Sequence, residues 1–136
     1  MAYGNTLLNE IDIMRQMDHK HILKMLAFSF NIYSETNFII YEHMNTNLID
    51  LLNRNKINSI QTVVKITRQI TSALVYLHQR LYIIHRDLRA KNVFASNDFI
   101  VKIGNFNLAK KLDINNEYKI KSDIKEGMRI IRKRLL

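Results

Sequence analysis

The most constraining feature of this chain is the run His85-Arg86-Asp87-Leu88-Arg89-Ala90-Lys91-Asn92. The run is polar and highly charged, yet apolar segments flank it, with Tyr82–Ile84 before it and Val93–Ala95 after it. Short segments rich in Ile, Val and Phe are typical of strands. We therefore expect a polar loop held at both ends by strands, which gathers its charged side chains in one place.

The rest of the chain mixes helical and strand patterns. Leu7–Met17 repeats apolar residues at helical spacing, which predicts a helix with one apolar face. The same spacing predicts the longest helix over about Gln61–Gln79, and Leu48–Asn53 is a shorter helical candidate. Segments rich in Ile, Phe and Val predict two hairpins: Ile22–Phe30 with Asn37–Tyr41, and Val93–Ala95 with Ile100–Ile103. An α+β fold is therefore expected.

Composition excludes several classes of protein. A chain of 136 residues suits one domain, and its 47% hydrophobic and 24% charged residues indicate a folded chain rather than a disordered one. No apolar run reaches the roughly 20 residues that cross a bilayer, and the polar start lacks a signal-peptide pattern. Because the chain has no cysteine, it forms neither disulfides nor thiolate metal sites, and a cytoplasmic location is the default expectation.

With this order of elements the chain resembles the middle of a protein kinase domain, where H-R-D-L-x-x-x-N is the catalytic loop. The resemblance implies a partial protein-kinase-like fold: a remnant of the small lobe plus the start of the large lobe. We expect a partial kinase domain over residues 1–121 and a basic tail over residues 122–136. Arg-Ala-Lys-Asn at the end of the loop and Asn116-Glu117-Tyr118 downstream are most similar to Src-type tyrosine kinases.

The resemblance implies catalytic roles for three residues of the loop. Asp87 corresponds to the Asp that accepts the proton of the substrate hydroxyl, and Asn92 to a ligand of Mg²⁺. Arg89 would place positive charge near the transferred phosphoryl group. Asp87, Arg89 and Asn92 are therefore the expected catalytic residues.

The resemblance also implies a set of residues that bind ATP. Glu10 corresponds to the helix carboxylate that pairs with the phosphate-binding lysine, and Tyr41 to the gatekeeper at the back of the pocket. Glu42 and Met44 fall in the hinge whose backbone binds adenine, and Phe94 completes the expected cofactor-binding set. Taken alone, Glu10 equally fits an ordinary solvated helix carboxylate, so this alternative stays open.

The segment Ile103-Gly104-Asn105-Phe106-Asn107-Leu108-Ala109-Lys110 departs from the family's Ile-Gly-Asp-Phe-Gly-Leu-Ala-Lys at two positions. Asn105 replaces the Asp that holds Mg²⁺. An amide keeps one carbonyl oxygen but loses the charge, whereas Mg²⁺ prefers anionic oxygen ligands. Asn92 and Asn105 are the expected metal ligands, with weakened binding. Asn107 replaces a glycine and tolerates left-handed backbone angles less readily.

Other parts of the family pattern are missing from the sequence. Average usage predicts about nine glycines and about seven prolines in this length, whereas the chain has three and none. It contains no Gly-x-Gly-x-x-Gly loop, no Val-Ala-Ile-Lys strand before the first helix and no Ala-Pro-Glu segment. Glu10 is therefore expected to have no lysine partner within this chain, and the shortened sheet is expected to be unstable by itself.

By resemblance, the function is ATP-dependent phosphorylation of protein tyrosine, with Mg²⁺ as cofactor and a protein as substrate. The departures lead us to expect a truncated and degenerate chain that transfers no phosphate in isolation. Two alternatives stay open. One is a pseudokinase fragment that regulates or binds a protein such as a partner kinase, and the other is an incomplete gene model or decayed copy.

The C-terminal segment is strongly basic. Residues 119–136 hold seven Lys or Arg against two Asp or Glu, a net charge of +5 out of the chain's +9. Such a cluster can bind phosphate backbones or acidic membranes. Because neither interleaved aromatic residues nor a nucleic-acid-binding fold accompanies it, the favoured interpretation is a solvated basic end without specific nucleic-acid binding.

Overall fold

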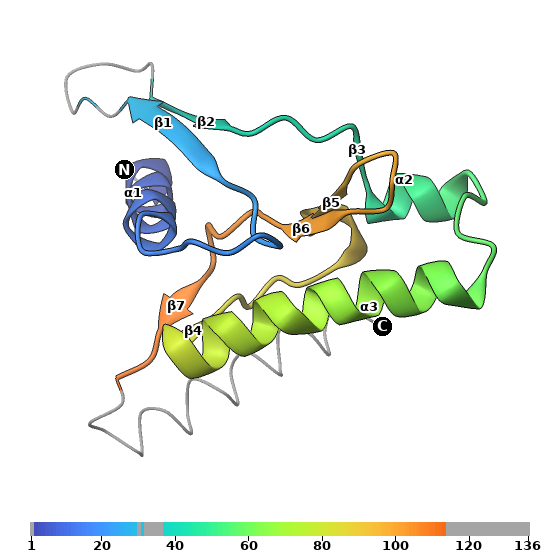
Figure 1. Ribbon diagram of the computed structural model, residues 1–136. Coiled ribbons are helices and arrows are strands. Elements are labelled where there is room, and N and C mark those ends of the chain that lie inside the picture. The colour runs from blue at the N-terminus through green and yellow to red at the C-terminus, as the bar shows by residue number, and fades with distance from the viewer. Residues whose placement is uncertain (1, 30, 32–36, 114–136) are drawn as a thin grey trace.

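The structure, a computed structural model, describes residues 2–29, 31 and 37–113. Figure 1 shows two groups of elements. Helix α1 (Ala2–Met14) lies beside the hairpin of β1 (Met25–Ser29) and β2 (Phe38–Tyr41), and the long helix α3 (Ile60–Val75) runs along the other side of the molecule. Short strands and the polar loop connect the two groups.

Helix α1 buries the apolar face that its spacing predicts. Ile11, Ile13 and Met14 are buried, and Glu10 is buried with them at 8% relative exposure. Because an ionisable side chain is rarely buried without partners, the position of Glu10 requires hydrogen-bond donors inside the molecule.

The β1–β2 hairpin is antiparallel, with an irregularity in its register between Met25 and Ala27. Four large apolar side chains of this hairpin remain 43–58% exposed: Leu26, Phe28, Phe38 and Ile40. A two-stranded sheet is marginal in water unless a further element packs against it. The hairpin therefore depends on packing against other elements for its stability.

Side-chain caps begin the two remaining helices. Asn47 caps α2 (Leu48–Asn53) and Ser59 caps α3; in each case the side-chain oxygen accepts from the backbone N–H three residues later, at 3.0 and 3.2 Å. Helix α3 continues directly into a π-helical turn, Tyr76–Arg80. The long helix predicted from the apolar spacing is thus present, with a change of winding in its last turn.

Five further short strands are β3 (Thr46–Asn47), β4 (Ile83–Ile84), β5 (Val93–Ala95), β6 (Val101–Ile103) and β7 (Lys110–Lys111). Strands β5 and β6 form the predicted hairpin, and β3 pairs with the other edge of β5. Strand β4 pairs with β7 in a separate antiparallel sheet. The polar loop runs from β4 to β5 and therefore bridges two sheets.

Two hydrophobic clusters hold these elements together. One joins both groups through Met14 of α1, Leu77 and Ile83 near the end of the long helix, and the fully buried Phe106. The other lies between α2, α3 and the β5–β6 hairpin. The mixed helix-and-strand architecture expected from the sequence is confirmed. Tyr118 and the boundary expected near residue 121 lie outside the described residues.

In the part of the chain that the structure describes, no helix is both long enough and apolar enough to cross a bilayer.

Candidate active site

The polar loop is fixed to the segment that follows β6. Arg86 adopts a left-handed backbone angle (φ 65°), which is uncommon for a residue other than glycine. Its Nε donates a hydrogen bond to the backbone carbonyl of Leu108 at 2.5 Å. At the other end of the loop, a 3-10 turn over Ala90–Asn92 leads directly into β5. Backbone and side-chain contacts therefore fix the conformation of the loop at both ends.

Asp87 is buried and held by two of its loop neighbours. Arg89 Nε lies 3.1 Å from Asp87 Oδ1. Asn92 Nδ2 donates to the Asp87 carbonyl at 2.8 Å and to Asp87 Oδ2 at 3.1 Å. The three predicted catalytic residues are thus in direct contact, with the carboxylate oriented by one cation and one amide.

Asn92 also contacts the predicted metal residue Asn105. Asn105 Nδ2 donates to Asn92 Oδ1 at 3.0 Å, and Asn105 has a left-handed backbone angle (φ 63°). The amide hydrogen thus points at the oxygen that a cation would take. Among the described residues, no three His, Cys, Asp or Glu side chains gather to hold a metal ion. In this conformation the Asn92–Asn105 pair does not fit Mg²⁺, and its metal-binding role stays a prediction.

His85 connects the loop to the Gly104–Phe106 segment. Its Nδ1 accepts from the Asp87 backbone N–H at 3.2 Å, so the ring proton is on Nε2, which donates to the Gly104 carbonyl at 2.9 Å. The ring packs against Phe106 with 4.7 Å between ring centroids. Burial lowers the pKa of His85 to about 4, so the ring is neutral at physiological pH.

Glu10 of α1 is satisfied by two donors of this chain. Tyr41 Oη donates to Glu10 Oε1 at 2.9 Å, and the Phe106 backbone N–H donates to the same oxygen at 3.0 Å. Burial, together with the Glu10 charge, raises the pKa of Tyr41, so its hydroxyl stays protonated and remains a donor. The alternative of a solvated Glu10 is therefore wrong for this structure.

A cleft of about 610 Å³ lies where these elements meet. Seven of the nine predicted site residues line it: Glu10, Tyr41, Glu42, Met44, Asn92, Phe94 and Asn105. Leu23 and His43 complete the lining. Asp87 and Arg89 are not part of this lining, and Asp87 lies beside it through its contact with Asn92. The structure thus brings residues from five separate segments around one cavity.

The absence of a side chain at Gly104 allows the Phe94 ring, which lines the cleft, to pack close to the Gly104 backbone. A Cβ atom at position 104 would come within 2.7 Å of the Phe94 ring and 3.0 Å of Leu23. A side chain at this position would therefore displace the Phe94 ring that lines the cleft. The small residue keeps this wall in place.

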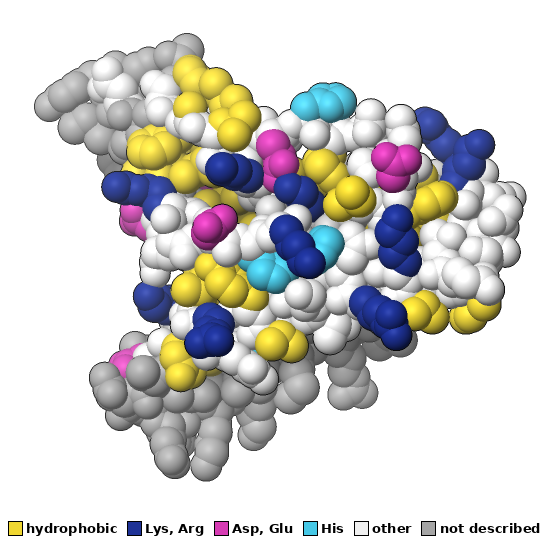
Figure 2. Space-filling view, in the orientation of Figure 1, with side chains coloured by type: hydrophobic (Ala, Val, Ile, Leu, Met, Phe, Trp, Pro, Cys, Tyr) yellow, Lys and Arg dark blue, Asp and Glu magenta, His cyan; other side chains and the backbone are white. Residues whose placement is uncertain are grey.

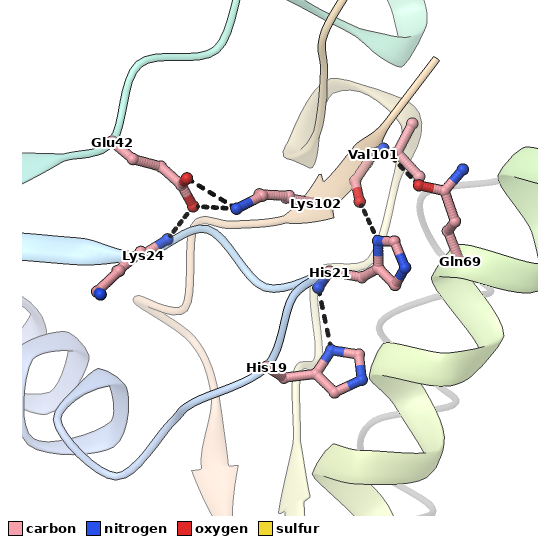
Figure 3. A network of polar contacts seen from close by, with 7 residues as sticks. All are labelled: His19, His21, Lys24, Glu42, Gln69, Val101 and Lys102. Atoms are coloured by element: carbon pink, nitrogen blue, oxygen red, sulfur yellow. Dashed lines mark hydrogen bonds and ion pairs between the residues drawn. The ribbon is translucent and has the colours of Figure 1, made fainter. Parts of the chain in front are cut away.

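The Glu42 carboxylate has a structural role. It contacts Lys102 Nζ at 2.6 and 2.7 Å, and its Oε1 accepts from the Lys24 backbone N–H at 2.7 Å (Figure 3). The Glu42 backbone N–H donates to the Lys24 carbonyl at 2.9 Å. Glu42 thus fixes the hinge segment to β6 and to the residue before β1, and the expected contact of the hinge backbone with adenine stays a prediction.

Sequence reasoning missed the polar network between α3 and β6. Gln69 Oε1 accepts from the Val101 backbone N–H at 2.9 Å, and Gln69 Nε2 donates to the Phe99 carbonyl at 2.9 Å. The His21 ring contacts the Val101 carbonyl at 3.0 Å (Figure 3). A signal was present, since Gln69 is a polar residue three positions after Ile66 on the apolar stripe of the helix.

Comparisons with known proteins agree on a family. The family model for protein tyrosine and serine/threonine kinases matches residues 2–131. MAP3K epsilon protein kinase 1 of Brassica napus is 31% identical over 111 residues, and the cell cycle serine/threonine-protein kinase CDC5/MSD2 of Saccharomyces cerevisiae is 35% identical over 113 residues. Tyrosine-protein kinase JAK1 of Danio rerio is 35% identical over 124 residues.

These alignments cover most of this chain but little of the relatives. They span 80, 83 and 89% of the chain, in the order above, and 8, 16 and 11% of the three relatives. Among solved structures, a chain in the crystal structure of the yeast RNA Pol II CTD kinase CTDK-1 complex superposes with a TM-score of 0.70 at 25% identity. That match covers 80% of this chain and 36% of the other.

Proposed function

The chain belongs to the protein tyrosine and serine/threonine kinase family, and on that premise we propose that it binds ATP in a retained cleft but does not transfer phosphate efficiently. Kinases of this family transfer a phosphoryl group from ATP, with Mg²⁺, to a protein hydroxyl. The observation that carries the proposal is the cleft of about 610 Å³, whose lining includes seven residues that the sequence resemblance had predicted for the site.

The nucleotide base is proposed to lie between the hinge and Phe94. Glu42, Met44 and Phe94 all line the cleft. A flat aromatic base suits a cavity with an aromatic wall and nearby backbone polar groups. Tyr41 also lines the cavity, and its hydroxyl already donates a hydrogen bond to Glu10.

The catalytic loop is proposed to retain its proton acceptor. Asp87 is oriented by Arg89 and Asn92, and a carboxylate held in this way can accept the proton of a hydroxyl placed beside it. The weakness lies at Asn105, whose amide donates to Asn92 instead of supplying a second anionic oxygen. We therefore place the defect in charge stabilisation of the phosphate rather than in proton transfer.

Tyrosine is the proposed acceptor, on the strength of Arg89-Ala90-Lys91-Asn92 in the loop. Both serine/threonine and tyrosine kinases occur among the relatives, so this specificity rests on the sequence motif alone. The proposed location is the cytoplasm.

A second candidate function is protein binding without catalysis, as expected of a pseudokinase fragment. Phe38 and Ile40, alternate residues of β2 that are 50 and 48% exposed, favour it, because exposed apolar side chains on the same side of a strand often mark interaction sites. The partner would be a protein such as an intact kinase. If the chain co-purifies with a kinase domain and the Leu26→Ser, Phe38→Ser double variant does not, the result would support this function. If the double variant still co-purifies, the hairpin is not the binding surface.

Fluorescence titration with a ribose-labelled ATP analogue tests the nucleotide proposal. Phe94→Ala removes the aromatic wall and is expected to weaken binding by about tenfold, the loss typical of one buried aromatic contact. Phe38→Ala removes an exposed phenylalanine from β2, away from the cleft lining, and serves as the matched control. Equal affinity of the three proteins, or no binding that unlabelled ATP displaces, would contradict the proposal.

A further inference from the structure

A second, larger concavity lies along α3, apart from the nucleotide cleft. This open groove has a volume of about 940 Å³ and lies between α3, the segment before β1 and the turn between β5 and β6. Among the described residues, its lining and that of the cleft have none in common. Figure 2 shows this face, with Lys and Arg side chains spread over the α3 region near histidine rings. An occupant of this groove would leave the cleft free.

The floor of the groove is apolar and exposed. Ile60, Val64 and Ile100 are 68, 42 and 44% exposed, although all three are aliphatic. Adjacent exposed aliphatic residues within a concave surface indicate a site for apolar side chains rather than for a simple ion.

The rim of the groove is basic. Lys20, Lys65 and Arg68 surround the floor. Within the described residues, ion pairs join Arg89 to Asp87 and Lys102 to Glu42, so none of the three rim cations pairs with a described carboxylate. Lys65 Nζ instead donates to the backbone carbonyl of Asp98 at 2.6 Å. The rim therefore carries three positive charges that described side chains do not neutralise.

Three polar side chains of the groove already have hydrogen-bond partners within the chain. Gln69 is bonded to Val101 and Phe99, and His21 to the Val101 carbonyl. The Ser72 hydroxyl pairs with His19 Nε2 at 3.2 Å. Recognition of an occupant therefore falls to the rim cations and the aliphatic floor, on a surface that is largely pre-formed.

We propose that this groove docks an acidic peptide segment of a partner protein that carries aliphatic side chains. Charge complementarity selects this occupant. A second copy of the chain is disfavoured by its net charge of +9, and the chain's own residues 119–136 by their net charge of +5. Single-stranded RNA is disfavoured because no Phe, Tyr or Trp occurs among the described residues of the lining.

The test measures fluorescence anisotropy of a labelled peptide, Glu-Glu-Leu-Glu-Leu-Asp-Leu-Glu, on the full chain. Arg68→Glu is expected to weaken binding by about tenfold or more at low salt. Arg80→Glu makes the same charge change at an exposed position in the turn that follows α3, and is expected to change affinity less than about twofold. Similar losses in both variants would overturn the assignment to this groove.

Further probes exclude the other occupants. The peptide with Ser in place of Leu is expected to bind more weakly, and equal binding would overturn the role of the floor. An oligouridylate that binds more tightly than the peptide, or displacement by a peptide of residues 119–136, would also overturn the proposal. Because the groove lies apart from the cleft, Arg68→Glu is expected to leave binding of the ATP analogue unchanged, so this proposal and the nucleotide proposal fail separately.

Discussion

The Tyr41 hydroxyl donates a 2.9 Å hydrogen bond to Glu10 Oε1, a carboxylate 31 residues earlier in the chain. The same oxygen accepts from the Phe106 backbone N–H. In the described fold these two neutral donors meet the buried carboxylate. Glu10 therefore couples α1 both to Tyr41 at the end of β2 and to the segment that contains Asn105.

Removing the Tyr41 hydroxyl tests this coupling. Tyr41→Phe is expected to lower the free energy of unfolding by about 1–2 kcal/mol, because a buried carboxylate loses a hydrogen bond. The amide of Phe106 is expected to exchange faster with solvent. Urea denaturation and hydrogen exchange measure the two effects. Tyr82→Phe, at a tyrosine that is 43% exposed, is the control; an equal loss in both variants would contradict the coupling.

Stability is expected to depend on pH through His85. Burial lowers its pKa to about 4 from the ordinary 6.5, so the folded state disfavours the protonated ring. The contribution of the neutral His85 ring to the free energy of unfolding is therefore fully present above pH 6.5 and is lost as the pH falls from 6.5 to about 4. By proton linkage this amounts to about 2 kcal/mol between pH 7 and pH 5.

His85→Phe isolates the contribution of this ring. Burial also lowers the pKa values of His19 and His21. Protonation of these two rings therefore lowers the free energy of unfolding on acidification, as protonation of His85 does. The variant retains those two rings, so the unfolding free energy of the native chain should fall more steeply from pH 7 to pH 5 than that of the variant. Parallel curves would contradict a neutral, buried His85.

Gln69 is expected to be a strong stabilising residue despite its polarity. Gln69→Ala leaves the Val101 N–H and the Phe99 carbonyl without their partner, which is expected to cost about 2–3 kcal/mol. Gln61→Ala makes the same substitution at an exposed position in the first turn of α3. Urea denaturation compares the two, and a loss at Gln61 as large as that at Gln69 would contradict the role of the network.

The β1–β2 hairpin is expected to open more readily than α3. It has two strands and four exposed apolar residues, and such a sheet is marginal without further support. Hydrogen exchange should show faster exchange at Ala27 and Ile39 than at Ile66 and Ile70. Uniform protection across both regions would indicate a single cooperative unit and contradict this expectation.

The sequence predicted local structure better than it predicted the contacts between elements. The Leu48–Asn53 helix and the β5–β6 hairpin follow from spacing and turn residues, which act over a few positions. The pairing of Ile83 with Lys111 was not predicted, because a two-residue strand carries no periodicity. The distant Tyr41–Glu10 contact was not predicted either, since a side-chain pair leaves no local pattern.

The candidate site shows the same division. The loop motif specified Asp87 and Asn92 because five fixed positions lie within eight residues. It did not reveal that the Asn105 amide donates to Asn92, which depends on the left-handed backbone at Asn105. Nor did it reveal that the Glu42 carboxylate pairs with Lys102 of β6, because both partners look like ordinary surface charges in the sequence.

The substitution Asn105→Asp tests where the defect lies. A carboxylate cannot donate to Asn92 Oδ1, and it supplies an anionic oxygen to the cleft. Binding of the ATP analogue should therefore become more dependent on Mg²⁺. Phosphate transfer by this 136-residue chain is not expected to return, because its sequence contains neither a Gly-x-Gly-x-x-Gly loop nor a Val-Ala-Ile-Lys segment. Recovery of turnover by this variant would mean that Asn105 is the sole defect.

The most direct test of the central claim measures nucleotide binding and phosphate transfer on the same purified chain. The ATP analogue is expected to bind and to be displaced by unlabelled ATP. With ATP, Mg²⁺ and either a tyrosine or a serine peptide, the chain is expected to form no more phosphopeptide than the Asp87→Asn variant does. Turnover clearly above that level, abolished by Asp87→Asn, would contradict the account and identify a working kinase; the peptide that is phosphorylated would then settle its acceptor.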